Sequence, residues 1–186
     1  MAEGRNAALS RLAAGNALNK TSGPLRPNYA RVKQEVHRLL TEFQITEPPV
    51  DPVYISRNLG VEVVFGEFIG GSTDISGFYD CDENAIYVNS DEYPLRQTFT
   101  VAHELGHKIL HEEWARSSDY KVLLRDQSND GDDPREKEAN AFAGHLLVPR
   151  SLLNRYWQVM NIEELSCVFA VSVPVIRNRI SFEYGV

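Results

Sequence analysis

The sequence has few cysteines, no long apolar run and no excess of positive charge, and each shortage excludes a class of protein. The two cysteines, Cys81 and Cys167, lie far apart and in no CxxC pair, so a disulfide framework is excluded and a cytoplasmic location is expected. No stretch approaches the roughly 18 apolar residues of a membrane span, so we expect no membrane partner. Lys and Arg total 19 against 26 Asp and Glu, and this net charge of −7 disfavours direct nucleic-acid binding.

The composition predicts one folded domain preceded by a leader. The 186 residues, 42% hydrophobic and 24% charged, suffice for a single sizeable core. Residues 1–28 differ because they are rich in Ala, Asn, Gly and Arg and contain one acid, Glu3. We interpret them as a flexible basic leader rather than an organellar transit segment. The rest, 29–186, is expected to be one domain with a helical C-terminal part at 151–183.

Apolar periodicity and capping signals predict a mixed fold. Helices are expected at 29–43, between Asp51 and Gly60, at 94–113, at 134–148 and, as shorter pieces, within 151–183. Strands are expected at 61–65, 75–79, 85–89 and 120–124. The expected fold is α+β, mostly helical, with a small three-stranded antiparallel sheet packed on the helix at 94–113.

The residues with the clearest chemical meaning form an HExxH motif on that helix, His103-Glu104-Leu105-Gly106-His107. Histidines four apart lie on one helical face, so both imidazoles can bind one metal ion. Glu104, beside the first histidine, can take a proton from a water that the metal activates. The motif therefore predicts a catalytic metal site with Glu104 as the general base.

A catalytic zinc needs a third protein ligand, for which three residues compete. His111 lies eight residues from His103, about 12 Å along the helix, which is too far for a shared ion. His111 is expected instead to cap the helix, to pack in the core, or to contact a metal ligand without binding the metal itself. Glu136 is the third helical residue after the N-cap Asp133, where a capping box would fold its side chain back on the start of the helix. Glu138 borders the apolar face of the helix at 134–148, so helical phase favours Glu138 over Glu136.

Two segments together resemble the ImmA/IrrE family of bacterial and phage metallopeptidases. One segment runs from Thr98 to His111 around HExxH, and the other is Glu136-Lys137-Glu138-Ala139-Asn140-Ala141-Phe142-Ala143 with Leu146-Leu147-Val148-Pro149. The resemblance extends upstream to 76–78 and 86–89, and downstream to 165–179. The paired motifs at this spacing are far more specific than HExxH alone.

The resemblance implies a zinc endopeptidase in which His103, His107 and Glu138 bind the metal and Glu104 is the general base. It supports Glu138 because the family's glutamate precedes an Ala-Asn pair, as Glu138 does here. Family members act in the cytoplasm on repressors with helix-turn-helix domains, and cleavage releases stress or mobile-element genes. Ligand types alone do not separate zinc from manganese.

Several points stay open in the sequence. The donor that would stabilise the oxyanion is not identified, and Tyr120, His111 and His145 are unranked. If the strand at 85–89 is a sheet edge beside the cleft, an extended substrate could pair with it. A non-cleaving binding module of the same fold is the alternative function, and the intact Glu104 argues against it. The helix-turn-helix rhythm at 161–182 is better explained by packing, since its charged residues sum to −1.

Overall fold

The computed structural model describes residues 26–68, 75–117 and 133–186. Almost all of the leader predicted at 1–28 lies outside these ranges, as do the strand predicted at 120–124 and the candidate Tyr120. The described elements are α2 (Tyr29–Glu42), α3 (Pro52–Asn58), β1 (Glu62–Gly66), β2 (Gly77–Asp80), β3 (Ala85–Asn89), α4 (Pro94–Leu110), α5 (Glu112–Ala115), α7 (Pro134–Leu147), α8 (Arg150–Leu153), α9 (Ile162–Phe169) and α10 (Val173–Tyr184). The predicted α+β class, mostly helical with a small sheet, is confirmed.

Local sequence signals explain where the principal helices begin. The side chains of Asn28, Asp51 and Asp133 each accept a hydrogen bond from a first-turn backbone N–H, which satisfies donors that the helix leaves free. Pro52 and Pro134 then occupy the first helical position, where a missing N–H costs nothing. The long helix predicted to reach Glu113 ends earlier, at Leu110, and α5 follows as a separate turn.

The sheet corrects the predicted antiparallel arrangement, because it is mixed. Its order is β1-β3-β2, with β2 antiparallel to β3 and β1 parallel to β3. The hairpin turn between β2 and β3 is closed by Asp80, whose carboxylate accepts from the backbone N–H groups of Asp82 and Glu83. Strand β3 is therefore central and buried along its whole length, so the idea that substrate pairs with it is wrong.

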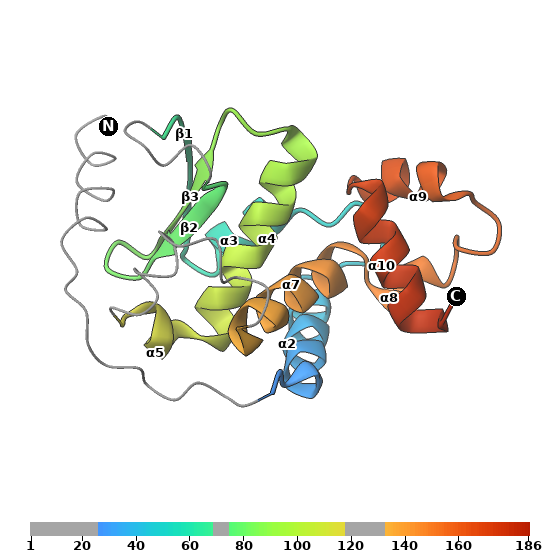
Figure 1. Cartoon of the computed structure of the whole chain (residues 1–186), viewed down its shortest axis with the longest axis horizontal. Coiled ribbons are helices and arrows are strands. Elements are labelled where there is room, and N and C mark those ends of the chain that lie inside the picture. The colour runs from blue at the N-terminus through green and yellow to red at the C-terminus, as the bar shows by residue number, and fades with distance from the viewer. Residues whose placement is uncertain (1–25, 69–74, 118–132) are drawn as a thin grey trace.

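Helix α4 packs directly on the sheet, and a glycine makes the close approach possible. A Cβ atom at Gly77 in β2 would lie 2.5 Å from Cγ2 of Thr100 and 2.6 Å from the carbonyl oxygen of Tyr87. Any side chain there would push the helix away from the strand. The sheet lies on one side of α4, and the C-terminal helices α8–α10 lie at the far end of the molecule (Figure 1).

Helix α7 crosses α4 at a second close contact (Figure 1). A Cβ atom at Gly106 would lie 3.3 Å from Cα of Ala139 and 3.1 Å from Cδ1 of Phe142. Gly106 lies inside the HExxH motif, so the close approach of α4 to α7 occurs beside the two histidines. This packing sets which side of α7 faces them.

The C-terminal helices α9 and α10 meet at 105° around a turn in which Ala170 has a φ of +51°. No single helix in the described ranges is long and apolar enough to cross a membrane. Among the described helices, only α9 and α10 taken together, across their bend, have the length and the composition that a membrane span requires. Arg179 of α10 is buried, pairs with Glu183 at 2.7 Å and donates to the carbonyl of Val148. A buried, paired arginine is not part of a surface that could read DNA.

A buried histidine lies at the junction of α7 and α10. His145 lies 3.6 Å from the Glu183 carboxylate and edge-on to Phe182, with a ring-centroid distance of 5.2 Å. Burial, followed by the positive charge of Arg179, lowers the pKa of His145 to about 4 against the opposing effect of Glu183. The imidazole is therefore neutral in the folded protein near pH 7.

We expect the free energy of unfolding to fall as the pH drops from 6.5 toward 4. In that window the unfolded chain binds a proton at His145 that the folded chain does not, which costs about 2 kcal/mol by pH 5. Urea unfolding of the metal-free protein at pH 7 and pH 5 measures this loss, and His145→Gln should reduce it by about that amount. His37→Gln, on the exposed side of α2, is the control. An equal loss in parent and His145→Gln would contradict the assignment.

Candidate metal centre

Two histidines of α4 and one glutamate of α7 converge on a single point. Nε2 of His103 and Nε2 of His107 lie 3.1 Å apart. The Glu136 carboxylate meets both, at 3.2 Å from His103 and 3.1 Å from His107. Among the described residues these three form the group of side chains whose donor atoms are close enough to hold one metal ion.

The spacing of these donor atoms fits a tetrahedral ion. Zinc–nitrogen bonds of about 2.0–2.1 Å set tetrahedral donors about 3.3 Å apart. The two Nε2 atoms, 3.1 Å apart, are close to that value, and each lies 3.1–3.2 Å from a different oxygen of the Glu136 carboxylate. Two neutral imidazoles and a carboxylate are a donor set that catalytic zinc sites use. The residues therefore fit the metal that the motif predicted.

The structure does not bring Glu138, the predicted third ligand, to this point. Its carboxylate accepts hydrogen bonds from Nε2 of His111 at 2.6 Å and from the backbone N–H of Asn28 at 2.5 Å. The physical reason is helical phase, since the Ala139 face of α7 meets α4 at Gly106. Glu136, three residues before Ala139, lies on that face, whereas Glu138 lies on the flank toward α2.

The capping-box interpretation of Glu136 also needs correction. Asp133 caps α7 as predicted, by accepting from the backbone N–H of Arg135. The Glu136 side chain does not return to the helix start but reaches across to the histidines. A carboxylate drawn to two imidazoles in a buried site gains stronger interactions than a surface cap provides.

His111 connects Glu138 to the candidate ligand His107. Nδ1 of His111 lies 3.3 Å from Nδ1 of His107, and its Nε2 faces Glu138. Burial lowers the pKa of His111, so it is neutral and has one donor and one acceptor nitrogen. With a metal bound, the tautomers that satisfy this chain would put a proton on Nε2 of His111 and on Nδ1 of His107. Nε2 of His107 then keeps its lone pair toward the metal position.

Asn140 has the corresponding role for the other histidine, and the sequence reasoning missed it. Its Oδ1 lies 3.0 Å from Nδ1 of His103, so it accepts that proton and frees Nε2 of His103. The signal was available, because Asn140 follows Glu136 by four residues and so shares its helical face.

Of the residues considered as oxyanion donors, His111 is engaged by His107 and Glu138, and His145 lies in the interface with α10.

The electrostatics of the site keep Glu136 ionised. Burial alone would raise the pKa of Glu136, but in the metal-free site the hydrogen bonds that His103 and His107 donate to it outweigh burial and lower it. Burial likewise opposes protonation of His103, while the hydrogen bond that His103 donates to Glu136 and the charge of Glu104 raise its pKa. A centre with two buried carboxylates around two imidazoles is negative in character and attracts a cation.

Glu104 is a buried carboxylate next to this group. It is buried, 5% exposed, and adjoins His103 in the chain. Its charge acts on the His103 imidazole, yet its carboxylate is not one of the three converging donors. It is thus a buried carboxylate beside the metal position but outside the ligand set.

In this mostly helical α+β fold, an HExxH helix and a glutamate from a second helix bring together donors that could hold a metal ion. The chain belongs to the Peptidase M78 family, because the model of the IrrE N-terminal-like domain matches residues 57–181. That range includes α4, α7 and α9 and most of α10, so it contains the whole candidate metal centre.

Two individual proteins resemble this chain. An uncharacterized immunity region protein 2 of Bacillus phage phi105 is 30% identical over 139 residues, which are 74% of this chain and 78% of the phage protein. A solved structure of a Mycobacterium tuberculosis transcriptional regulator matches with a TM-score of 0.59 at 21% identity. That match covers 81% of this chain but 47% of the regulator, so this chain spans about half of the regulator's length. The likeness to the regulator shows a shared fold.

Proposed function

We propose that this protein is a zinc-dependent endopeptidase that cleaves a helix-turn-helix transcriptional repressor in the cytoplasm. The observation that carries the proposal is the convergence of His103, His107 and Glu136, at 3.1–3.2 Å, beside the buried Glu104. Membership of a peptidase family supports the reaction class. The ligand set of the proposal is His103, His107 and Glu136, and Glu104 is its general base.

In the proposed mechanism each residue has one task. His103, His107 and Glu136 would hold a zinc ion, which would supply Lewis acidity toward a water molecule and a substrate carbonyl. Glu104 accepts the proton of the attacking water and returns it to the leaving amine, so one peptide bond is hydrolysed without a covalent enzyme intermediate. Asn140 and His111 hold the imidazoles in the orientation and tautomer that ligation requires.

The substrate class rests on the relatives. One is named as a protein of a phage immunity region and the other as a transcriptional regulator, and both names concern control of gene expression. The family resemblance seen in the sequence pairs such peptidases with helix-turn-helix repressors. Residues 29–186 would form the peptidase domain, with 151–183 as its helical C-terminal part.

The direct test is incubation of the purified protein with the helix-turn-helix protein encoded beside its gene. Intact-mass spectrometry should show two new fragments whose masses sum to the repressor plus one water. A chelator should prevent their appearance, and added Zn²⁺ should restore it, with Mn²⁺ run in parallel. Stable co-elution of the two proteins with no fragment under any metal condition would favour the non-cleaving binding module instead.

A further inference from the structure

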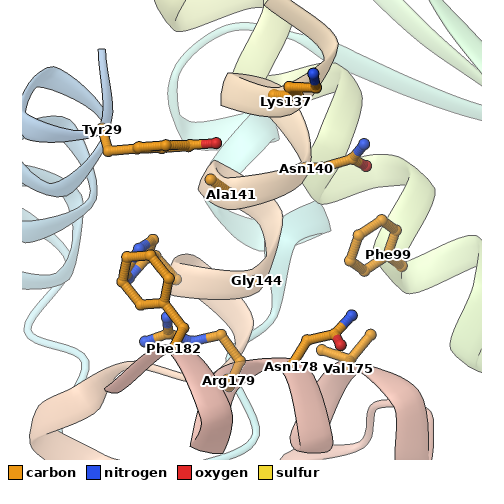
Figure 2. A pocket seen from close by; sticks show the side chains of 11 residues that line it. Tyr29, Phe99, Lys137, Asn140, Ala141, Gly144, Val175, Asn178, Arg179 and Phe182 are labelled. Atoms are coloured by element: carbon orange, nitrogen blue, oxygen red, sulfur yellow. The ribbon is translucent and has the colours of Figure 1, made fainter. Parts of the chain in front are cut away.

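A pocket of about 400 Å³ opens between α2, α4, α7 and α10, and the proposed mechanism does not use it (Figure 2). Tyr29 faces it from α2, Phe99 from α4, and Val175 and Phe182 from α10, while one side of α7 forms its floor. Its volume lies at the lower end of the roughly 300–1,000 Å³ of known ligand pockets.

The pocket is continuous with the candidate metal centre. Asn140 lines the pocket and also holds Nδ1 of His103 at 3.0 Å. Phe99 lines it as well, and its ring centroid lies 6.5 Å from that of His103. Asn140 follows Glu136 by one helical turn and Phe99 precedes His103 by one turn, so the pocket begins where the metal ligands end. A chain bound at the metal centre would therefore have a side chain within reach of this pocket.

The lining of the pocket is mainly apolar and aromatic. Phe182 is 50% exposed although it contacts Tyr29 at a centroid distance of 6.4 Å, so an apolar face remains accessible. Phe99 and Val175 lie together on the opposite side in Figure 2.

Two of the ionisable groups that line the pocket, Arg179 and His145, do not present an uncompensated charge to it. The guanidinium of Arg179 is offset by Glu183 at 2.7 Å. The His145 imidazole is neutral near pH 7, because burial and the charge of Arg179 lower its pKa to about 4. Lys137 stands at the upper end of the pocket in Figure 2, beyond Asn140. Such a lining disfavours a charged group in the interior and favours an apolar one.

We infer that this pocket is a specificity subsite that receives one bulky apolar side chain, aromatic or long aliphatic, of the polypeptide bound at the metal centre. The inference rests on the proposed function, and it adds a residue preference close to the scissile bond. Aromatic rings bury 150–250 Å² each and pack edge-to-face with other rings, so a pocket with aromatic walls binds an aromatic side chain most favourably.

The first experiment is cleavage of a library of tryptic peptides, with the new ends identified by mass spectrometry. The parent should show Phe, Tyr, Leu or Met enriched at one position near the cut. Val175→Asp puts a charge in the pocket wall in the first turn of α10, where an acid suits the helix dipole. It should lower cleavage of the preferred peptides by about 10- to 100-fold. Val173→Asp, in the same turn but outside the lining, should leave both rate and preference unchanged.

The second experiment tests the pocket without requiring cleavage. N-acetylphenylalanine amide should shift the amide NMR signals of Asn140, Ala141 and Gly144, and N-acetylalanine amide should not. Ala141→Phe, which fills the pocket from α7, should abolish these shifts while zinc content stays at the parent level.

The combined outcomes separate the two proposals. Cleavage with no apolar preference, or with one that Val175→Asp leaves intact, overturns the subsite while the peptidase function stands. Aromatic-specific shifts without any cleavage retain the pocket and overturn the peptidase function. No shift with the aromatic amide overturns the subsite in either case.

Discussion

Zinc binding is expected to fall far more steeply in Glu136→Ala than in Glu138→Ala. Glu136 supplies one of the three converging donors, so its loss leaves two imidazoles and an incomplete site. Glu138 acts on His107 only through His111, and losing support of that kind typically costs about 10- to 100-fold in metal affinity. We expect Glu136→Ala to lose more than this range and to be purified without zinc.

The measurement is competition for Zn²⁺ against a chromophoric chelator, together with metal content by mass spectrometry. Lys137→Ala, between the two glutamates on α7, controls for the effect of substitution in this helix. Glu138→Gln keeps an oxygen that accepts from His111 and should recover part of the affinity that Glu138→Ala loses. A larger loss in Glu138→Ala than in Glu136→Ala would return Glu138 to the ligand set.

Replacing Glu104 with glutamine is expected to remove hydrolysis and keep the metal. Glutamine has nearly the same shape but does not accept a proton from water, and general-base catalysis contributes about 10²- to 10⁴-fold. Because the Glu104 carboxylate is outside the converging donor set, zinc affinity should stay within a few-fold of the parent. A single-turnover assay on the cleaved repressor gives the rate, and the same chelator competition gives the affinity.

Two outcomes of this experiment would revise the mechanism. Equal rates in parent and Glu104→Gln would remove Glu104 from the proton transfers. A loss of zinc along with activity would make Glu104 part of the metal site rather than the base. Glu112→Gln serves as the control, because Glu112 is a half-exposed glutamate that pairs with Lys108 and Arg116 on the surface.

Local patterns in the sequence predicted the elements well because their causes are local. The aspartate and proline signals at the starts of α3 and α7 correspond to observed caps. The parallel partner of β3 was not predictable in this way. The short turn between β2 and β3 predicts that these two strands pair as a hairpin. Nothing in the sequence near β1 indicates that it pairs with the other edge of β3.

The candidate for the third ligand shows the same limit. Helical phase placed Glu138 at the edge of an apolar face, and Glu138 is indeed buried, at 4% exposed. The sequence did not show that this edge faces α2 and His111, whereas the small residues Gly106 and Ala139 bring the Glu136 side to α4. Burial of a charged residue was predictable from one helix, but its partner depended on how two helices cross.

The contact between Glu138 and the backbone of Asn28 has a thermodynamic consequence. Asn28 is the N-cap of α2, and the same carboxylate that accepts its N–H also holds the His111–His107 pair. Any free energy that metal binding gains by fixing His107 is shared through this chain with the docking of the first turn of α2. Linkage is reciprocal. A partner that binds better when the first turn of α2 is undocked would lower metal affinity, and bound metal would lower the affinity of that partner by the same factor. The candidate metal centre and the N-terminal end of α2 are therefore joined by one chain of hydrogen bonds, although 110 positions in the chain separate Asn28 from Glu138.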